Sequence, residues 1–212
     1  MPLRGAVPAR DWRRTAIWLV SATLAYNVVE AVIALWSGER ADSIALFGFG
    51  LDSVIEFSAS GVVLWRYRVE SAGGSVEAVE VAEKRAHRFI GGTFLALAAY
   101  VAANAGWTLW KAEAPQPSLP GILLATASLL VMPVLSVAKL RVASRLGSRL
   151  LRAEAKETLA CSWLSLTLLL GLAANAWQGW WWADPVSAIA MVPWLVKEGL
   201  EGLRGEECAC DE

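Results

Sequence analysis

Long apolar stretches dominate this sequence, and their length constrains the fold more than any other feature. Six stretches are each long enough to cross the roughly 30 Å of hydrocarbon in a bilayer, because an α-helix rises about 1.5 Å per residue. They cover residues 14–36, 43–65, 87–110, 119–139, 156–178 and 184–203. We therefore predict an all-α, polytopic membrane protein, with a six-helix transmembrane domain over residues 1–204 and a short cytoplasmic tail over 205–212.

The composition agrees with a membrane location and excludes other classes of protein. Of the 212 residues, 56% are hydrophobic and 18% are charged, and the mean hydropathy is +0.45, which is unlike a soluble domain. A formal net charge of −1 leaves no basic surplus for binding nucleic acid. The N-terminal residues run into the first span without a small-residue cleavage site, so we expect a retained helix and not a signal peptide.

Positive residues are distributed unevenly between the two sides of the predicted bundle. They are frequent before the first span, between the second and third, and between the fourth and fifth, where we count Lys139, whereas the other connections offer only Arg40 and Lys111. Because cytoplasmic segments carry the excess of Lys and Arg, we predict that both termini are cytoplasmic in a cell membrane, inner or plasma. The opposite boundary resembles an interfacial aromatic belt, with Trp36, Trp107, Trp110, Trp177 and Trp180 to Trp182.

Two tight connections and one helical extension can also be inferred. The segment KAEAPQPSLP holds three prolines, which prevent the third and fourth spans from forming one helix. Between the fifth and sixth spans, Asp184 is placed to cap a helix that begins at Pro185. After the flexible residues 72–75, a charged stretch favours helix and is predicted to extend the third helix into the cytoplasm.

Two acidic residues lie where the second span should be most apolar. Asp52 and Glu56 are four residues apart, so both carboxylates project from one face near the middle of the helix. An ionised side chain at the bilayer centre costs about 2.5–3.5 kcal/mol, and we find no Lys or Arg at that depth in any span. The two acids must be protonated, be hydrated in a cavity or coordinate a cation, and the third option accounts for their pairing.

The fifth span offers a second pair with the same spacing, Glu157 and Cys161. With Asp52 and Glu56 it supplies three carboxylates and one thiol, which suit a tetrahedral Zn²⁺ site better than a site for Mg²⁺ or Ca²⁺. The sequence does not rank Zn²⁺ against Fe²⁺, Mn²⁺, Co²⁺ and Cd²⁺, and it implies no prosthetic group. The alternative is that Cys161 is a small buried apolar side chain and Glu157 a residue at the membrane boundary.

Four further polar residues are candidates for a lesser role. Asn27 and Glu30, near the middle of the first span, would support the metal ligands or line the ion pathway, although Asn27 would equally suit a hydrogen bond between helices. Cys208 and Cys210 in the tail would capture a soft metal ion or simply belong to a frayed terminus. Three cysteines in these places cannot form a disulfide framework.

These motifs resemble the cation diffusion facilitator (CDF) family of metal/proton antiporters, whose second helix carries Asp-x-x-x-Asp and whose fifth carries His-x-x-x-Asp. This chain has Asp52-x-x-x-Glu56 and Glu157-x-x-x-Cys161 at those places. SIALFGFGLDS resembles the start of the family's second helix, LRAEAKETLACS that of its fifth and WWADPVSAIA that of its sixth. The resemblance implies six helices, a homodimer and exchange of metal ions for protons. It is to a short form, without the cytoplasmic domain that follows the sixth helix in most members.

We therefore expect a transporter that exports a divalent transition metal, with Zn²⁺ as the leading substrate, from the cytoplasm in exchange for protons. The alternative is a membrane protein that binds metal without transporting it, for structure or to regulate a partner. An enzyme is not expected, because there is no histidine within the membrane and no plausible pair of nucleophile and base. The expected partners are the lipid bilayer, metal ions, protons and a second copy of the chain, with no nucleic acid.

Overall fold

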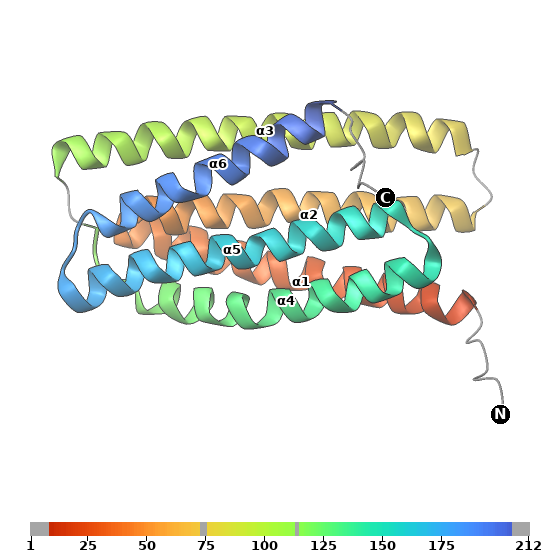
Figure 1. Cartoon of the computed structure of the whole chain (residues 1–212), viewed down its shortest axis with the longest axis horizontal. Helices are drawn as coiled ribbons and strands as arrows, with labels where there is room; N and C mark the ends of the chain where they lie inside the picture. The colour runs from red at the N-terminus through yellow and green to blue at the C-terminus, as the bar shows by residue number, and fades with distance from the viewer. Residues whose placement is uncertain (1–8, 73–75, 113–114, 205–212) are drawn as a thin grey trace.

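The computed structural model describes residues 9–72, 76–112 and 115–204, and these residues form six α-helices and no strand. The helices are α1 (Ala9–Ala41), α2 (Ile44–Ser71), α3 (Val76–Lys111), α4 (Leu119–Leu146), α5 (Arg149–Gln178) and α6 (Ala183–Arg204). Successive helices run in opposite directions, so the α2–α3 and α4–α5 connections lie at the end where α1 begins, which we call the N-terminal end (Figure 1). The all-α bundle predicted from the sequence is confirmed.

Each predicted span corresponds to one helix, and several helices continue beyond the span at the N-terminal end. The predicted extension of the third helix is confirmed, because α3 begins at Val76. Five of the six described helices are long and apolar enough to cross a membrane. The exception is α6, which carries five charged residues: Asp184, Lys197, Glu198, Glu201 and Arg204.

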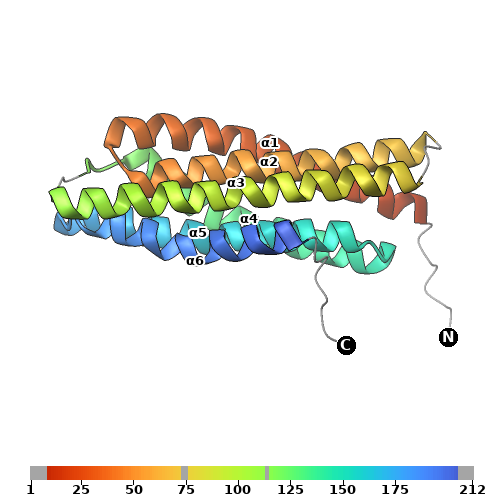
Figure 2. The same ribbon diagram turned by 90° about the horizontal axis from the view of Figure 1, so that it is seen from above.

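Four helices, α1, α2, α4 and α5, pack into a compact group, and α3 and α6 pack against each other along its α2–α5 side. Figures 1 and 2 show α3 and α6 running beside one another, with α1 and α2 in one layer and α4 and α5 in the other. Two glycines allow the close approach of α3 and α6: a Cβ atom at Gly91 would lie 2.8 Å from the carbonyl oxygen of Gly199. The α3–α6 pair therefore needs a residue without a side chain at this crossing.

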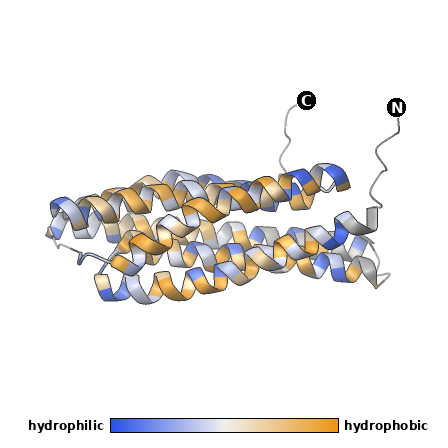
Figure 3. Cartoon of the chain, turned by 90° about the horizontal axis from the view of Figure 1, so that it is seen from below, coloured by the Kyte–Doolittle hydropathy of each residue, from blue (hydrophilic) through white to orange (hydrophobic). Residues whose placement is uncertain are grey.

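Hydrophobic residues cover most of the length of the bundle, and hydrophilic residues are concentrated toward its ends (Figure 3). The tryptophans assigned to one membrane boundary lie on α1, α3 and α5 and in the α5–α6 connection, at the end opposite the N-terminal end. Six of them are 42–90% exposed: Trp36, Trp107, Trp110, Trp177, Trp180 and Trp182. This is the placement that an interfacial aromatic belt requires.

Asp184 caps α2 and not its own helix, so the sequence-based expectation was wrong. The helix α6 already begins at Ala183, and the Asp184 carboxylate lies against the start of α2. One of its oxygens accepts a hydrogen bond from the Ser43 hydroxyl, and the other accepts one from the Ile44 amide at 3.1 Å. Ser43 itself accepts a hydrogen bond from the Leu46 amide at 3.1 Å. Because α2 and α6 begin at the same end of the bundle, the free amides at the start of α2 lie within hydrogen-bond distance of Asp184.

We predict that Asp184→Ala lowers the free energy of unfolding by about 1–2 kcal/mol, because the change leaves amides at the start of α2 without an acceptor. Glu39→Ala is the matched control: Glu39 is an exposed acid at the same end of the bundle, and its loss should cost less than about 0.5 kcal/mol. Reversible unfolding of both variants in mixed detergent micelles measures the difference. Equal stabilities would contradict the capping role.

Candidate metal site

Buried polar side chains lie inside the four-helix group, largely where two apolar clusters meet. Along α5, for example, Leu151 belongs to one cluster and Leu164 to the other, with Glu154 and Thr158 between them. Nine of these polar side chains are at most 5% exposed: Asn27, Glu30, Asp52, Glu56, Ser60, Ser136, Lys139, Glu154 and Thr158. Polar groups so far from solvent are costly unless they are paired or serve a function.

Glu30 on α1 is fully buried and is held by hydroxyl groups. Ser53 on α2 donates a hydrogen bond of 2.9 Å to one carboxylate oxygen, and Ser128 on α4 donates to the other. The Ser128 hydroxyl also lies 2.8 Å from the phenolic oxygen of Tyr26. The Cys161 thiol on α5 lies 4.0 Å from the Glu30 carboxylate. Glu30 therefore joins α1 to three other helices, which the sequence alone did not indicate.

Asp52 and Glu56 are both buried on α2, at 5% and 4% exposure. Thr158 donates a hydrogen bond of 2.9 Å to one oxygen of Glu56, and the other oxygen has no partner among the described residues. Asp52 has no hydrogen bond or ion pair within residues 9–72, 76–112 and 115–204. The charged groups that interact with it are other acids: Glu56, Glu30 and Glu198. Asp52 is therefore a buried carboxyl group without compensation from the described part of the chain.

Cys161 lies among these acids. Its side chain is 2% exposed, and it interacts with the carboxyl groups of Glu30, Glu56 and Asp52. The structure therefore brings three of the predicted ligands, Asp52, Glu56 and Cys161, into one neighbourhood, with Glu30 beside them. The acid on α1 belongs to this group more closely than its assignment to a supporting role suggested.

Glu157, the fourth predicted ligand, lies at the edge of this group. Its side chain is partly exposed, and the acids that interact with it are Glu198 on α6, Glu154 and Glu56. Glu56 is the one acid that interacts with both Cys161 and Glu157. Among the described residues, no three His, Cys, Asp or Glu side chains converge closely enough to hold a metal ion. Metal binding by the predicted ligands would therefore require their side chains to turn toward a common point.

The expectation that no basic residue accompanies these acids was wrong. Lys139 on α4 is fully buried, and its ammonium group forms an ion pair of 2.6 Å with Glu154 on α5. It also donates a hydrogen bond of 2.9 Å to Thr158, the residue that hydrogen-bonds Glu56. The sequence analysis had counted Lys139 as a loop charge, because the fourth span was taken to end there. The described part of α4 instead continues to Leu146.

A periodic signal for Glu154 and Glu198 was present in the sequence. Glu154 precedes Cys161 by seven residues and therefore shares its helical face. Glu198 follows the buried Met191 by seven residues, and it interacts with both Glu157 and Asp52. Both acids were overlooked because hydropathy places the boundary of the bilayer near them.

The remaining candidates are placed less clearly. Asn27 is fully buried, but its amide nitrogen and oxygen have no hydrogen-bond partner among the described residues, so no interhelical hydrogen bond from it is seen. Cys208 and Cys210 lie outside the described residues.

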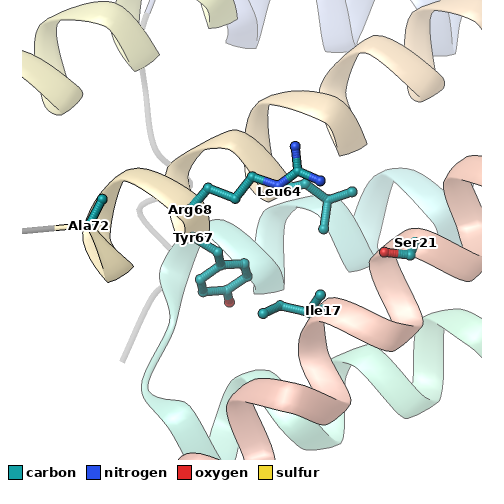
Figure 4. A pocket seen from close by; sticks show the side chains of 6 residues that line it. All are labelled: Ile17, Ser21, Leu64, Tyr67, Arg68 and Ala72. Atoms are coloured by element: carbon teal, nitrogen blue, oxygen red, sulfur yellow. The ribbon is translucent and has the colours of Figure 1, made fainter. Parts of the chain in front are cut away.

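An open groove of about 320 Å³ lies between α1 and α2 at the N-terminal end (Figure 4). Its lining contains no acid and no cysteine: Ile17, Ser21, Leu64, Tyr67, Arg68 and Ala72. Because its charged residue is Arg68, this groove does not suit a metal cation.

The fold and the enclosed acids together define a polytopic helical membrane protein with carboxyl groups gathered inside its bundle. The family model of the cation efflux transmembrane domain matches residues 19–204. The chain belongs to the cation efflux family, which the motifs in the second, fifth and sixth spans had predicted, and members of this family are transporters.

Transmembrane protein 163 of Xenopus laevis is a curated relative, 34% identical over 59 residues. The alignment covers 28% of this chain and 21% of the relative, so the chain matches about a fifth of that protein's length.

Proposed function

We propose that this protein transports divalent transition-metal ions, with Zn²⁺ as the expected substrate, from the cytoplasm across a cell membrane in exchange for protons. The observation that carries the proposal is Asp52, which is buried and uncompensated in a bundle that belongs to the cation efflux family. Glu56 and Cys161 lie in the same neighbourhood and supply further oxygen and sulfur ligands. Glu157 is proposed to complete the set when the side chains converge on the metal.

Repulsion between acids explains why convergence should need the metal. Like charges in a medium of low dielectric constant repel strongly, so carboxylates without a cation favour separation. A divalent ion reverses the sign of the interaction and draws the same groups together. The cytoplasmic location of both termini and assembly as a homodimer are proposed with this function, from the positive residues in the connections and from the family likeness.

We predict that Asp52→Ala abolishes metal flux while the protein still inserts and folds. Removing a buried carboxyl group that has no partner should be neutral or stabilising for the metal-free bundle, because its desolvation cost disappears. Flux of Zn²⁺ into proteoliposomes, with thermal unfolding in detergent, measures both effects.

Glu39→Ala is the control for that experiment, because it removes an exposed acid outside the site. Wild-type flux in Asp52→Ala would contradict the proposed site. Zn²⁺ binding without flux in the wild-type protein would support the alternative, a membrane protein that holds metal and does not transport it.

Proton exchange gives a separate prediction. Carboxylates coordinate a metal only when they are deprotonated, so a proton and a metal exclude each other at the same oxygens. Zn²⁺ flux in proteoliposomes should therefore rise when the side that receives the metal is made more acidic, and it should fall when the pH gradient is collapsed. Zn²⁺ flux that does not change with the pH gradient would contradict proton exchange but not metal transport itself.

The role of Cys161 can be tested through metal preference. A thiolate is a softer ligand than a carboxylate, so Cys161→Asp should shift the flux ratio of Zn²⁺ to Mn²⁺ toward Mn²⁺ by about tenfold, and Cys161→Ser should weaken Cd²⁺ and Zn²⁺ transport most. If Cys161 only fills space, the Ser and Ala variants should keep all flux ratios at a stability cost of about 1 kcal/mol. Relative Zn²⁺, Cd²⁺ and Mn²⁺ flux distinguishes the two roles.

A further inference from the structure

Lys139 occupies a site that resembles a cation-binding site built from oxygen atoms. Its ammonium group lies 2.6 Å from a carboxylate oxygen of Glu154 and 2.9 Å from the hydroxyl of Thr158. Ser60 on α2 donates a hydrogen bond of 2.9 Å to the same oxygen of Glu154. All four side chains are at most 2% exposed. Three helices thus surround a positive charge that belongs to the protein itself.

Thr158 connects this charge to the proposed metal site. Its hydroxyl accepts a hydrogen bond from Lys139 and lies 2.9 Å from a carboxylate oxygen of Glu56, to which it donates. A hydroxyl that accepts from an ammonium group becomes a stronger donor, so the two bonds reinforce each other. Glu157 also lies close enough to Lys139 for an electrostatic interaction. Lys139 therefore acts on two of the proposed ligands without touching either.

The carboxylates around Lys139 have oxygen atoms that accept no hydrogen bond. One oxygen of Glu56 and one oxygen of Glu154 are buried and have no hydrogen-bond partner among the described residues. An ionised carboxylate can accept about four hydrogen bonds, and buried polar atoms are rarely left without any. These two free oxygens are a second sign that this part of the bundle is arranged for a cation beyond the ammonium group.

We propose that Lys139 is a positioning residue for the metal site, a tethered counter-cation that is held by Glu154 and competes with the transported metal for the carboxylate of Glu56. In the metal-free protein the ammonium group pairs with Glu154 and, through Thr158, orients Glu56. An arriving divalent ion draws Glu56 toward Asp52 and weakens its link to Thr158. The competition lowers the affinity for metal and so favours release. This inference rests on the proposed function and adds a residue that sets the affinity of the same site.

The proposal predicts opposite effects for the two members of the ion pair. Lys139→Met removes the competing positive charge, so Zn²⁺ should bind more tightly. Glu154→Gln frees the ammonium group to pair with Glu56, so Zn²⁺ should bind more weakly. Interactions between charges in a protein interior are strong enough for each shift to reach about tenfold in the dissociation constant. A purely structural ion pair would instead make both single variants worse in the same direction.

The experiment measures Zn²⁺ dissociation constants of the purified full-length protein in detergent by competition with a chromophoric chelator. Thermal unfolding without metal is recorded for each variant. Lys197→Met is the matched control, because Lys197 on α6 is 56% exposed and its described contacts are with the partly exposed Glu201 and the Trp194 ring. The double variant Lys139→Met/Glu154→Gln has no net change in charge and should bind Zn²⁺ within about threefold of wild type. If Lys139→Met fails to fold, the comparison of Glu154→Gln with the double variant still tests the proposal.

Opposite shifts in the single variants and recovery in the double variant are the expected result. Unchanged affinities, or weaker binding in both single variants, would overturn the role of Lys139 even if the wild-type protein binds and transports Zn²⁺. Wild-type protein that binds Zn²⁺ but does not transport it would refute the proposed transport and leave the competition measurable. Wild-type protein that binds no divalent metal would refute both.

Discussion

The interior of this bundle is short of positive charge, and its polar contacts follow from that shortage. Among the side chains that the structure describes, Lys139 is the single buried Lys or Arg, whereas Glu30, Asp52, Glu56 and Glu154 are all buried acids. One ammonium group can compensate one carboxylate, so the other acids must carry protons or be balanced by an external cation. The ammonium group pairs with Glu154 and hydroxyl groups donate hydrogen bonds to Glu30, whereas Asp52 has neither kind of partner among the described residues. An external cation would therefore be stabilised most strongly beside Asp52.

The helix α2 holds the parts of the structure together, because it contacts α1, α3, α5 and α6 and carries two proposed ligands. At the end opposite the N-terminal end, Asp184 of α6 binds the first amides of α2. A movement that changes access to the site must either break this contact or carry α2 and α6 together. The close crossing of α3 and α6 at Gly91 and Gly199 then makes α3 part of the same unit.

Apolar length was sufficient to predict the helices, because the thickness of the bilayer imposes it on a sequence. The pairings inside the bundle were harder, since they depend on which helices become neighbours. Lys139 was counted as a loop charge and Glu154 was overlooked, because hydropathy alone set the ends of the spans. Only the packing of α4 against α5 shows that the two residues meet. Ser53 likewise donates a hydrogen bond to Glu30 from another helix, which its place in the sequence does not reveal. A spacing of four residues identifies a shared face and says nothing about the partner opposite it.

The same shortage of positive charge bears on the departure of this chain from the family pattern in the fifth helix. The family pattern of three carboxylates and a histidine carries three formal negative charges when fully ionised. Asp52, Glu56 and Glu157 already supply that number here, so a neutral Cys161 thiol would preserve the charge of the site and a thiolate would add a fourth negative charge. The acid Glu30 lies beside Cys161, and the nearby ammonium group is already paired with Glu154. A thiolate at Cys161 would therefore be stabilised only when a metal ion is present to balance its charge. The ion that binds at this site thus assembles its own set of ligands.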